Sequence, residues 1–207
     1  MIAELEVLAP GEALFDMDGT LITNDIAESC LRRVDRLGHR NAVTNSHASV
    51  FDHYVSIPDY VGQCKYAALA LGGLRVAQVE QMVDDAVASG DNAPVEAVVA
   101  LAHWMSQRHR VWLLTGSPEI LGEIVARRLG LRRWFGIKVP QDGDVLRAET
   151  YGVVTADVGK VEAAWVMTGR IPVFAIGDSK HDLPLLRHAK VARTCGKSAG
   201  VEFPAYP

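Results

Sequence analysis

The sequence predicts an α/β protein with a doubly wound, mostly parallel, Rossmann-like sheet and an inserted all-helical domain. Two observations lead to this fold class. In the second half of the chain, short apolar segments typical of buried strands alternate with helical patterns. Residues 23–91, in contrast, contain several helical stretches and almost no strand pattern. We therefore expect a core formed by 1–22 and 92–207 and a separate helical domain formed by 23–91.

The core is expected to contain four buried parallel strands, at 12–16, 111–115, 172–176 and 190–193. Between the later strands lies the helical sequence SPEILGEIVARRLG at 117–130. Ser117 suits the N-cap of this helix, Pro118 its first position, and Gly130 a left-handed residue that ends it. Two more helices are predicted at 157–168 and 180–188. Ligands bind such sheets at the carboxyl ends of the strands.

The inserted domain is expected to consist of four helices, at 24–38, 45–55, 58–71 and 75–89. Pro94 then opens a further helix that leads back to the strand at 111–115. The segment 137–154 carries an Asp142-Gly143 turn between β-prone runs, which predicts a hairpin.

Charge and composition exclude several classes of partner. The chain has 207 residues, a formal net charge of -4 and a sequence pI of about 6.0, so no overall basic field attracts nucleic acid or an anionic membrane. The three widely spaced cysteines form neither a disulfide framework nor a metal-binding pattern. No apolar stretch approaches the length of a membrane span, and the acidic N-terminal sequence lacks the basic start of a signal peptide. We expect a cytoplasmic monomer or homodimer.

Polar residues gather where the predicted strands end. Asp16 and Asp18 follow the first strand, Thr115-Gly116 follows the second, and Asp178 and Asp182 come just after the third. Lys160 lies near the start of the preceding helix. Because parallel strands present their carboxyl ends to one crevice, four carboxylates, a hydroxyl and an ammonium group are expected to converge.

This set of groups suits phosphoryl transfer. A carboxylate can attack phosphorus, and a second acid can protonate the leaving alcohol. Clustered carboxylate oxygens select Mg²⁺, which offsets the repulsion between nucleophile and phosphate. A hydroxyl, backbone N–H groups and a lysine can hold the remaining phosphate oxygens.

Four motifs resemble those of the haloacid dehalogenase superfamily, in the order of that family and across nearly the whole chain. They are D-x-D-G-T at 16–20, Thr115-Gly116, Lys160 and G-D-x-x-x-D at 177–182. The resemblance implies that Asp16 is the nucleophile and Asp18 the general acid/base. It also implies Mg²⁺ bound by the Asp16 carboxylate, the Asp18 main-chain carbonyl and the Asp178 carboxylate. Asp182 would act through water or orient Lys160, while Thr115, Gly116 and Lys160 would bind phosphate.

The resemblance also indicates the reaction. The phosphatases of the superfamily carry an acid two residues after the nucleophile, as Asp18 does here, and its dehalogenases do not. It implies a Mg²⁺-dependent hydrolase of a small phosphorylated metabolite. A phosphotransferase or mutase is the alternative within the superfamily, and an inactive binding or regulatory protein is the alternative outside catalysis.

The helical insertion resembles the cap of the phosphoserine-phosphatase-like branch, where it sets substrate specificity. An acid soon after the first motif there contacts the amino group of the substrate, and Asp25 holds the matching position. No arginine aligns with the cap position that pairs with the carboxylate of phosphoserine. Phosphoethanolamine and phosphocholine therefore fit about as well as phosphoserine, and other phosphomonoesters stay open.

Structural interpretations compete for some of these residues. Asp25 would stabilise a helix dipole without any substrate, and Lys160 could be an exposed helix lysine. Asp178 and Asp182 could instead start a helix together with Ser179. His181 lies inside the last motif, and we predict a surface position for it.

Overall fold

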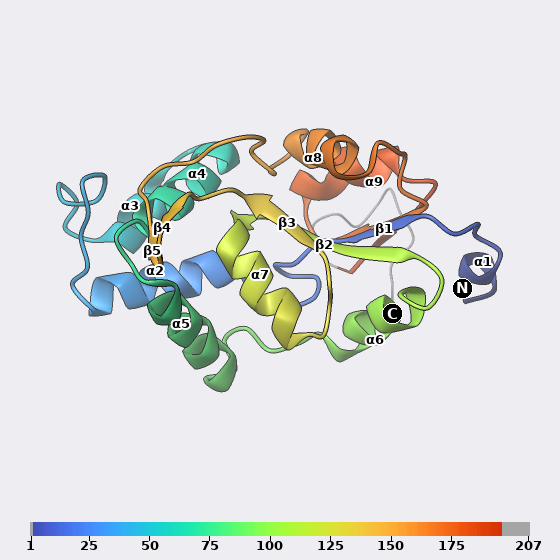
Figure 1. Cartoon of the computed structure of the whole chain (residues 1–207), viewed down its shortest axis with the longest axis horizontal. Coiled ribbons are helices and arrows are strands. Elements are labelled where there is room, and N and C mark those ends of the chain that lie inside the picture. Colours follow the sequence, from blue (N-terminus) through green and yellow to red (C-terminus); the bar gives the residue numbers. More distant parts are fainter. Residues whose placement is uncertain (1, 196–207) are drawn as a thin grey trace.

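The computed structural model describes residues 2–195 and contains a five-stranded, fully parallel sheet (Figure 1). Its strand order is β3-β2-β1-β6-β7. The strands are β1 (Glu12–Phe15), β2 (Arg110–Pro118), β3 (Trp134–Ile137), β6 (Phe174–Gly177) and β7 (Val191–Thr194). This topology confirms the predicted α/β class with a doubly wound, mostly parallel sheet.

Helices cover both faces of the sheet, as the continuous apolar strands require. One face, which includes Phe15 and Phe174 with ring centroids 5.5 Å apart, packs against α6 (Glu96–Met105) and α7 (Glu119–Arg128). The other face, which includes Leu14 and Ala175, packs against α8 (Gly159–Thr168) and α9 (Leu183–His188). Because successive side chains of a strand point to opposite faces, both layers are held by the same short strands.

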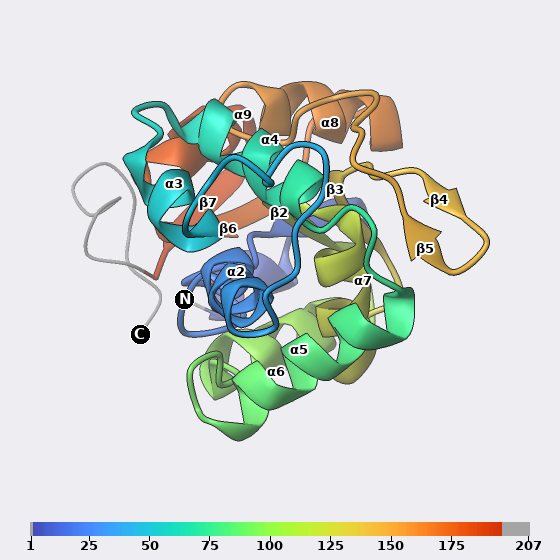
Figure 2. The ribbon, with the colours of Figure 1, turned by 90° about the vertical axis from the view of Figure 1, so that its left-hand side faces the viewer.

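The segment between β1 and α6 is helical and lies beyond the carboxyl ends of the strands (Figures 1 and 2). Its helices are α2 (Ile26–Arg36), α3 (Val50–Ser56), α4 (Tyr60–Ala70) and α5 (Val76–Ala88). The chain enters and leaves this segment at one place, since the N–H of Thr23 donates to the carbonyl of Ala93 and the N–H of Val95 to that of Leu21.

The helical segment also contacts the core along α7. Arg127 pairs with Glu80 at 2.5 Å, and Arg128 pairs with Asp84 at 2.5 Å. A hairpin of β4 (Gln141–Asp142) and β5 (Val145–Leu146) extends from the core toward the same helices, where the N–H of Val76 donates to the carbonyl of Asp144.

Several elements differ from the sequence-based expectation. The strand β3 and the short helix α1 (Ile2–Glu6) were not expected, and α3 starts at Val50 rather than 45. The predicted hairpin is confirmed but short, with two residues in each strand around Gly143 at φ +61°. The predicted helix 180–188 is divided into a 3₁₀ turn (Lys180–Asp182) and α9.

The predicted helix at 117–130 begins later than expected. β2 continues through Pro118, so α7 starts at Glu119 and Ser117 is not its N-cap. Gly130, with φ +69°, follows the last turn as predicted. Among residues 2–195, no helix is long and apolar enough to cross a membrane. Residues 196–207, which the predicted core includes, lie outside the described part of the chain.

Candidate active site

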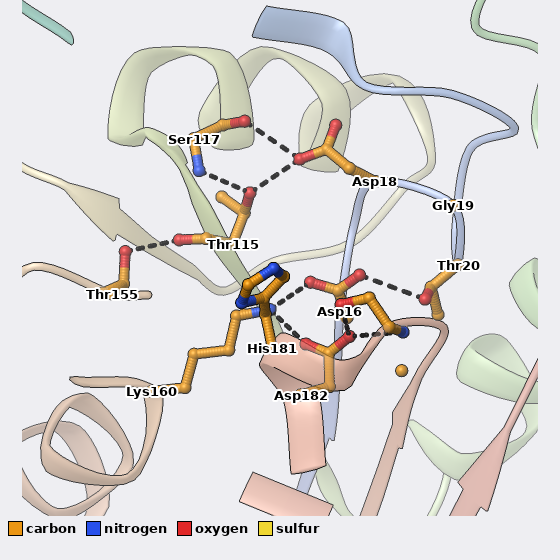
Figure 3. Close-up of polar contacts among 12 residues, drawn as sticks. Asp16, Asp18, Gly19, Thr20, Thr115, Ser117, Thr155, Lys160, His181 and Asp182 are labelled. Carbon is orange, nitrogen blue, oxygen red and sulfur yellow. Dashed lines mark hydrogen bonds and ion pairs between the residues drawn. The ribbon is translucent and has the colours of Figure 1, made fainter. Parts of the chain in front are cut away.

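Asp16 directly follows β1 and is buried at the carboxyl edge of the sheet, with 4% of its surface exposed (Figure 3). Its Oδ1 lies 2.5 Å from the ammonium group of Lys160, and its Oδ2 accepts a hydrogen bond from the hydroxyl of Thr20 at 3.1 Å. Burial is the main cause that raises the pKa of this carboxyl, and the neighbouring Asp182 adds to it. The group is thus fixed by two donors in a site that water hardly reaches.

Lys160 is not an exposed helix lysine. It is buried in the first turn of α8, and its ammonium group bridges Asp16 and Asp182. Burial opposes its charge, but the two carboxylates outweigh this effect and raise the pKa of Lys160. Asp182 in turn accepts hydrogen bonds from the N–H and the hydroxyl of Ser179, and Lys160 lowers its pKa against the effect of burial.

Three carboxylates form an acidic cluster at this edge. Oxygens of Asp16, Asp178 and Asp182 all lie within 4.8 Å of one another. Burial, and next the charge of Asp182, raise the pKa of Asp178 to about 6. Gly19, at φ +74°, lies so close to Asp178 that a β-carbon there would collide with its carboxylate. The donor set of hard oxygens, held together against their mutual repulsion, fits Mg²⁺.

Asp18 lies two residues beyond Asp16 and accepts hydrogen bonds on both oxygens. Oδ1 accepts from the N–H of Ile26 at 2.9 Å, and Oδ2 accepts from the hydroxyls of Thr115 at 3.1 Å and Ser117 at 2.9 Å. Burial, and then the charge of Asp25, raise the pKa of Asp18 to about 7, although these donors oppose the shift. A carboxyl of this pKa can both give and take a proton near neutrality.

Ser117 was predicted to be a helix N-cap, and this was wrong. Ser117 is 5% exposed at the end of β2, and its side chain points to Asp18 (Figure 3). The pattern Ser-Pro-Glu is typical of a helix start. The role of Ser117 as a donor to Asp18 depends on a contact between residues 99 positions apart, which no local pattern indicates. Sequence reasoning therefore missed Ser117 as a member of the site.

Thr115 and Gly116 lie where the second motif predicts them, at the end of β2 beside Asp18. The Thr115 hydroxyl donates to Asp18 and accepts from the N–H of Ser117 at 2.9 Å, so it belongs to the same network. Gly116 is buried, and a β-carbon on it would come within 2.9 Å of the Tyr60 hydroxyl from α4. The helical segment thus closely covers this part of the site.

Asp25 is the N-cap of α2, and its Oδ1 accepts a hydrogen bond from the N–H of Glu28 at 3.1 Å. Its Oδ2 also accepts a weaker hydrogen bond from the Tyr54 hydroxyl at 3.4 Å. Burial raises the pKa of Asp25. Within the described residues no salt bridge neutralises this carboxylate, so Asp25 has both a structural role and a free charge beside Asp18.

His181 lies in the site rather than on the outer surface, which corrects the prediction for this residue. Its Nδ1 is 2.6 Å from Oδ1 of Asp157, and its ring stacks on that of Tyr60 with centroids 3.9 Å apart. Tyr60 in turn lies close to Gly116, and His181 directly precedes Asp182 in the chain, so the imidazole belongs to the surroundings of the site (Figure 3). The G-D-x-x-x-D motif identifies the neighbouring Asp182, but no local pattern identifies the contact of His181 with a helix of the insertion.

The fold and the acidic cluster define an α/β protein with its polar groups at the carboxyl edge of a parallel sheet. A model of the haloacid dehalogenase-like hydrolase family matches residues 13–187. The chain belongs to this family, which confirms the resemblance of its four motifs.

Solved structures with a similar fold come from several proteins. A protein of unknown function from Bordetella pertussis Tohama I has a TM-score of 0.74 at 14% identity, covering 90% of each chain. A HAD family hydrolase from Salmonella enterica serovar Typhi has a TM-score of 0.66 at 18% identity, over 91% of this chain and 63% of that one. A phosphoserine phosphatase solved as a phospho-aspartyl intermediate analogue has a TM-score of 0.62 at 18% identity, over 92% and 88%. At these identities the similarity shows the fold.

A curated sequence also matches part of the chain. A glutamyl-tRNA reductase from Campylobacter concisus is 35% identical over 82 residues, which are 39% of this chain. The chain spans 18% of the length of that relative. So short a match describes a segment of each protein and does not define the family.

Proposed function

We propose that this protein is a Mg²⁺-dependent phosphatase that hydrolyses a small phosphorylated metabolite through a covalent intermediate on Asp16. The observation that carries the proposal is the buried contact between Asp16 and Lys160, with Asp178 and Asp182 beside it and Asp18 held two residues away. The similar fold of a phosphoserine phosphatase solved as a phospho-aspartyl intermediate analogue supports it.

Asp16 and Asp18 would share the chemistry in two steps. In the first, an oxygen of Asp16 attacks phosphorus, the bond from phosphorus to the alcohol oxygen breaks, and Asp18 gives its proton to that oxygen. In the second, water attacks the phosphorus of the aspartyl phosphate, Asp18 takes its proton, and Asp16 and inorganic phosphate are released. The pKa of about 7 suits Asp18 for both proton transfers.

Mg²⁺ would be held by the carboxylates of Asp16 and Asp178 and the main-chain carbonyl of Asp18. It would offset the repulsion between the nucleophile and the phosphate. Lys160, fixed by Asp16 and Asp182, would place a permanent positive charge next to the same phosphate. Thr115 and the N–H of Gly116 would bind the remaining phosphate oxygens once the Thr115 hydroxyl turns away from Asp18.

The helices between residues 23 and 91 would act as a cap that excludes water and selects the substrate. Asp25 and Tyr54 lie on this segment next to Asp18, and the Asp25 carboxylate has no cationic partner among the described residues. A substrate with an ammonium headgroup would supply that partner. Phosphoserine, phosphoethanolamine and phosphocholine all carry one, and we favour these types of substrate.

A panel of phosphomonoesters tests the proposal most simply. Phosphate release is measured from phosphoserine, phosphoethanolamine, phosphocholine, sugar phosphates, nucleotides and an activated aryl phosphate, with Mg²⁺ and with EDTA. We expect release that requires Mg²⁺ and is strongest for an ammonium-bearing compound. No release from any of them would contradict the hydrolase. Phosphate that passes to an added alcohol instead of to water would indicate the phosphotransferase.

A further inference from the structure

A second polar cavity lies at the opposite edge of the sheet from Asp16. It has a volume of about 760 Å³ and is lined by His103 of α6 and by segments that precede or begin the strands: 10–11 before β1, 106–111 at the start of β2, 130–133 before β3, and Arg170 before β6. Gly11 precedes β1 and Asp16 follows it, so the strand separates the two places by roughly 16 Å. The cavity is therefore distinct from the acidic site.

The cavity is strongly basic although the whole chain carries a net charge of -4. Five arginines from three separate segments line it, and none of its fourteen lining residues is acidic. The arginines are Arg108, Arg110, Arg132, Arg133 and Arg170. Five positive charges in one cavity repel one another. Binding of an anion there would reduce this repulsion and is therefore favoured.

Among the described residues, Glu12 neutralises part of this charge, and its attraction reaches Arg133 as well as Arg110. Arg110 pairs with Glu12, whose other oxygen accepts from the indole N–H of Trp112 at 2.8 Å. Arg108 donates to a main-chain carbonyl, that of Glu6, which carries no charge. The Arg133 guanidinium lies 6.0 Å from the centroid of the Trp112 ring.

Arg132 and Arg170 remain without a salt bridge in the part of the chain that the structure describes. Both are exposed and lie at the rim of the cavity, on the loops before β3 and β6. Their planar guanidinium groups are therefore available for an external anion.

His109 adds a buried polar group to the lining. It is 7% exposed, and its Nδ1 has no hydrogen-bond partner among the described residues. Burial, and then the charge of Arg108, lower the pKa of this imidazole, so it is neutral at pH 7. A neutral imidazole can accept or donate a hydrogen bond, and a buried nitrogen without a partner is the exception in folded proteins.

We propose that this basic cavity binds a small polyanion with two or more phosphate groups, such as a nucleoside diphosphate or triphosphate. Arginine forms paired hydrogen bonds with phosphate oxygens, and five guanidinium groups spread over three segments suit a chain of phosphates better than a single phosphate. The volume lies within the range of small-molecule sites. Nucleic acid is disfavoured by the net negative charge of the chain and by the confinement of the arginines to one hollow.

The experiment measures the binding of ATP, ADP, AMP and pyrophosphate to the full chain by calorimetry. The chain carries Asp16→Asn, so that the proposed active site does not hydrolyse the ligand. We expect affinity to rise with the number of phosphates. The double substitution Arg132→Ala/Arg170→Ala, added to this background, should weaken ATP binding on the order of a hundredfold, or about tenfold for each lost charge-assisted contact. With Asp16 intact, the same double variant should keep its phosphatase activity.

A matched control replaces two exposed arginines that lie outside the cavity. Arg75 and Arg147 each form an exposed ion pair, with Asp144 and Glu149, and Arg75→Ala/Arg147→Ala should leave ATP binding unchanged. Circular dichroism confirms that both double variants fold.

Three outcomes would overturn the proposal. One is the absence of binding by all four compounds, and another is equal ATP binding in the two double variants. The third is binding of a single-stranded oligonucleotide that ATP does not displace, which would assign the arginines to nucleic acid instead.

Discussion

The hydroxyl of Ser117 lies 2.9 Å from Oδ2 of Asp18, a contact that joins the end of β2 to the loop after β1. Thr115 donates to the same oxygen, and the N–H of Ile26 donates to the other, so Asp18 is held both from β2 and from α2, the first helix of the inserted segment. The proposed acid/base is thus positioned by groups that the four family motifs only partly contain.

Removing the Ser117 hydroxyl should affect proton transfer more than substrate binding. Because Ser117 stabilises the ionised form of Asp18, Ser117→Ala should raise the pKa of Asp18 further above its ordinary value. We expect kcat to fall about tenfold, with KM nearly unchanged. The pH profile of kcat should shift to higher pH. Ser106→Ala, which removes an exposed hydroxyl that donates to the His103 carbonyl, is the control, and an equal effect of both substitutions would argue against this role.

Asp25 should matter for the substrate more than for the fold. Asparagine caps helices as well as aspartate does, so Asp25→Asn keeps the hydrogen bond from Glu28 and removes only the charge. We expect KM for an ammonium-bearing substrate to rise about tenfold, while the melting temperature changes little. Asp59→Asn changes the matching N-cap of α4, which is exposed and accepts from Gly62, and should leave KM unchanged. An unchanged KM in Asp25→Asn would contradict a cationic headgroup at this position.

The stacked rings of Tyr60 and His181 should hold the cap against the core. Tyr60→Phe keeps the ring over the imidazole, whereas Tyr60→Ala removes it. Aromatic pairs contribute about 1 kcal/mol beyond their buried area, so we expect KM to rise roughly fivefold or more in the alanine variant alone. Steady-state kinetics of both variants check this, and equal values for phenylalanine and alanine would show that the stack is dispensable.

Asp35 should stabilise the loop between α2 and α3. Its carboxylate accepts hydrogen bonds from the N–H groups of Val50 and Phe51 and pairs with Arg40 at 3.0 Å. These donors outweigh its burial and lower the pKa of Asp35 below the value of about 3.9 expected in the unfolded chain. The ionised Asp35 carboxylate therefore stabilises the folded protein fully at a pH above the pKa of the unfolded chain. This stabilisation is lost as the pH falls through the pKa of Asp35 in the folded protein.

We expect Asp35→Ala to lower the free energy of unfolding by about 2 kcal/mol at pH 7. The difference from the unsubstituted protein should vanish in acid, as followed by urea denaturation at several pH values. Asp52→Ala, in the exposed first turn of α3, should change the stability by much less. A penalty for Asp35→Ala that stays constant down to acidic pH would contradict a charged role.

The sequence predicts the parallel core and its four motifs because their signals are local. Acidic residues or a threonine directly follow the apolar segments, and a lysine lies near the start of a predicted helix. Five residues of the site can therefore be located from the sequence: Asp16, Asp18, Thr115, Asp178 and Asp182. Their spatial convergence follows from the parallel topology alone.

The missed features depend on contacts between distant segments. The strand β3 has only four residues, with Gly136 inside it, which is too short for a clear strand pattern, and it is defined by its pairing with β2. Ser117 has the neighbours of a helix cap, yet Asp18 lies within reach of its hydroxyl. The α3 boundary is set by Asp35, fifteen residues before Val50.

The covalent step on Asp16 is the central claim, and trapping it is the most direct test. The protein is mixed with Mg²⁺ and its best phosphomonoester, quenched in acid within one turnover, digested and analysed by mass spectrometry, in parallel with Asp16→Asn. We predict one added phosphoryl group on the peptide that contains Asp16, absent from the variant, which folds but does not turn over. A phosphoryl group on another residue, or substantial turnover by Asp16→Asn, would contradict the assignment of Asp16 as the nucleophile.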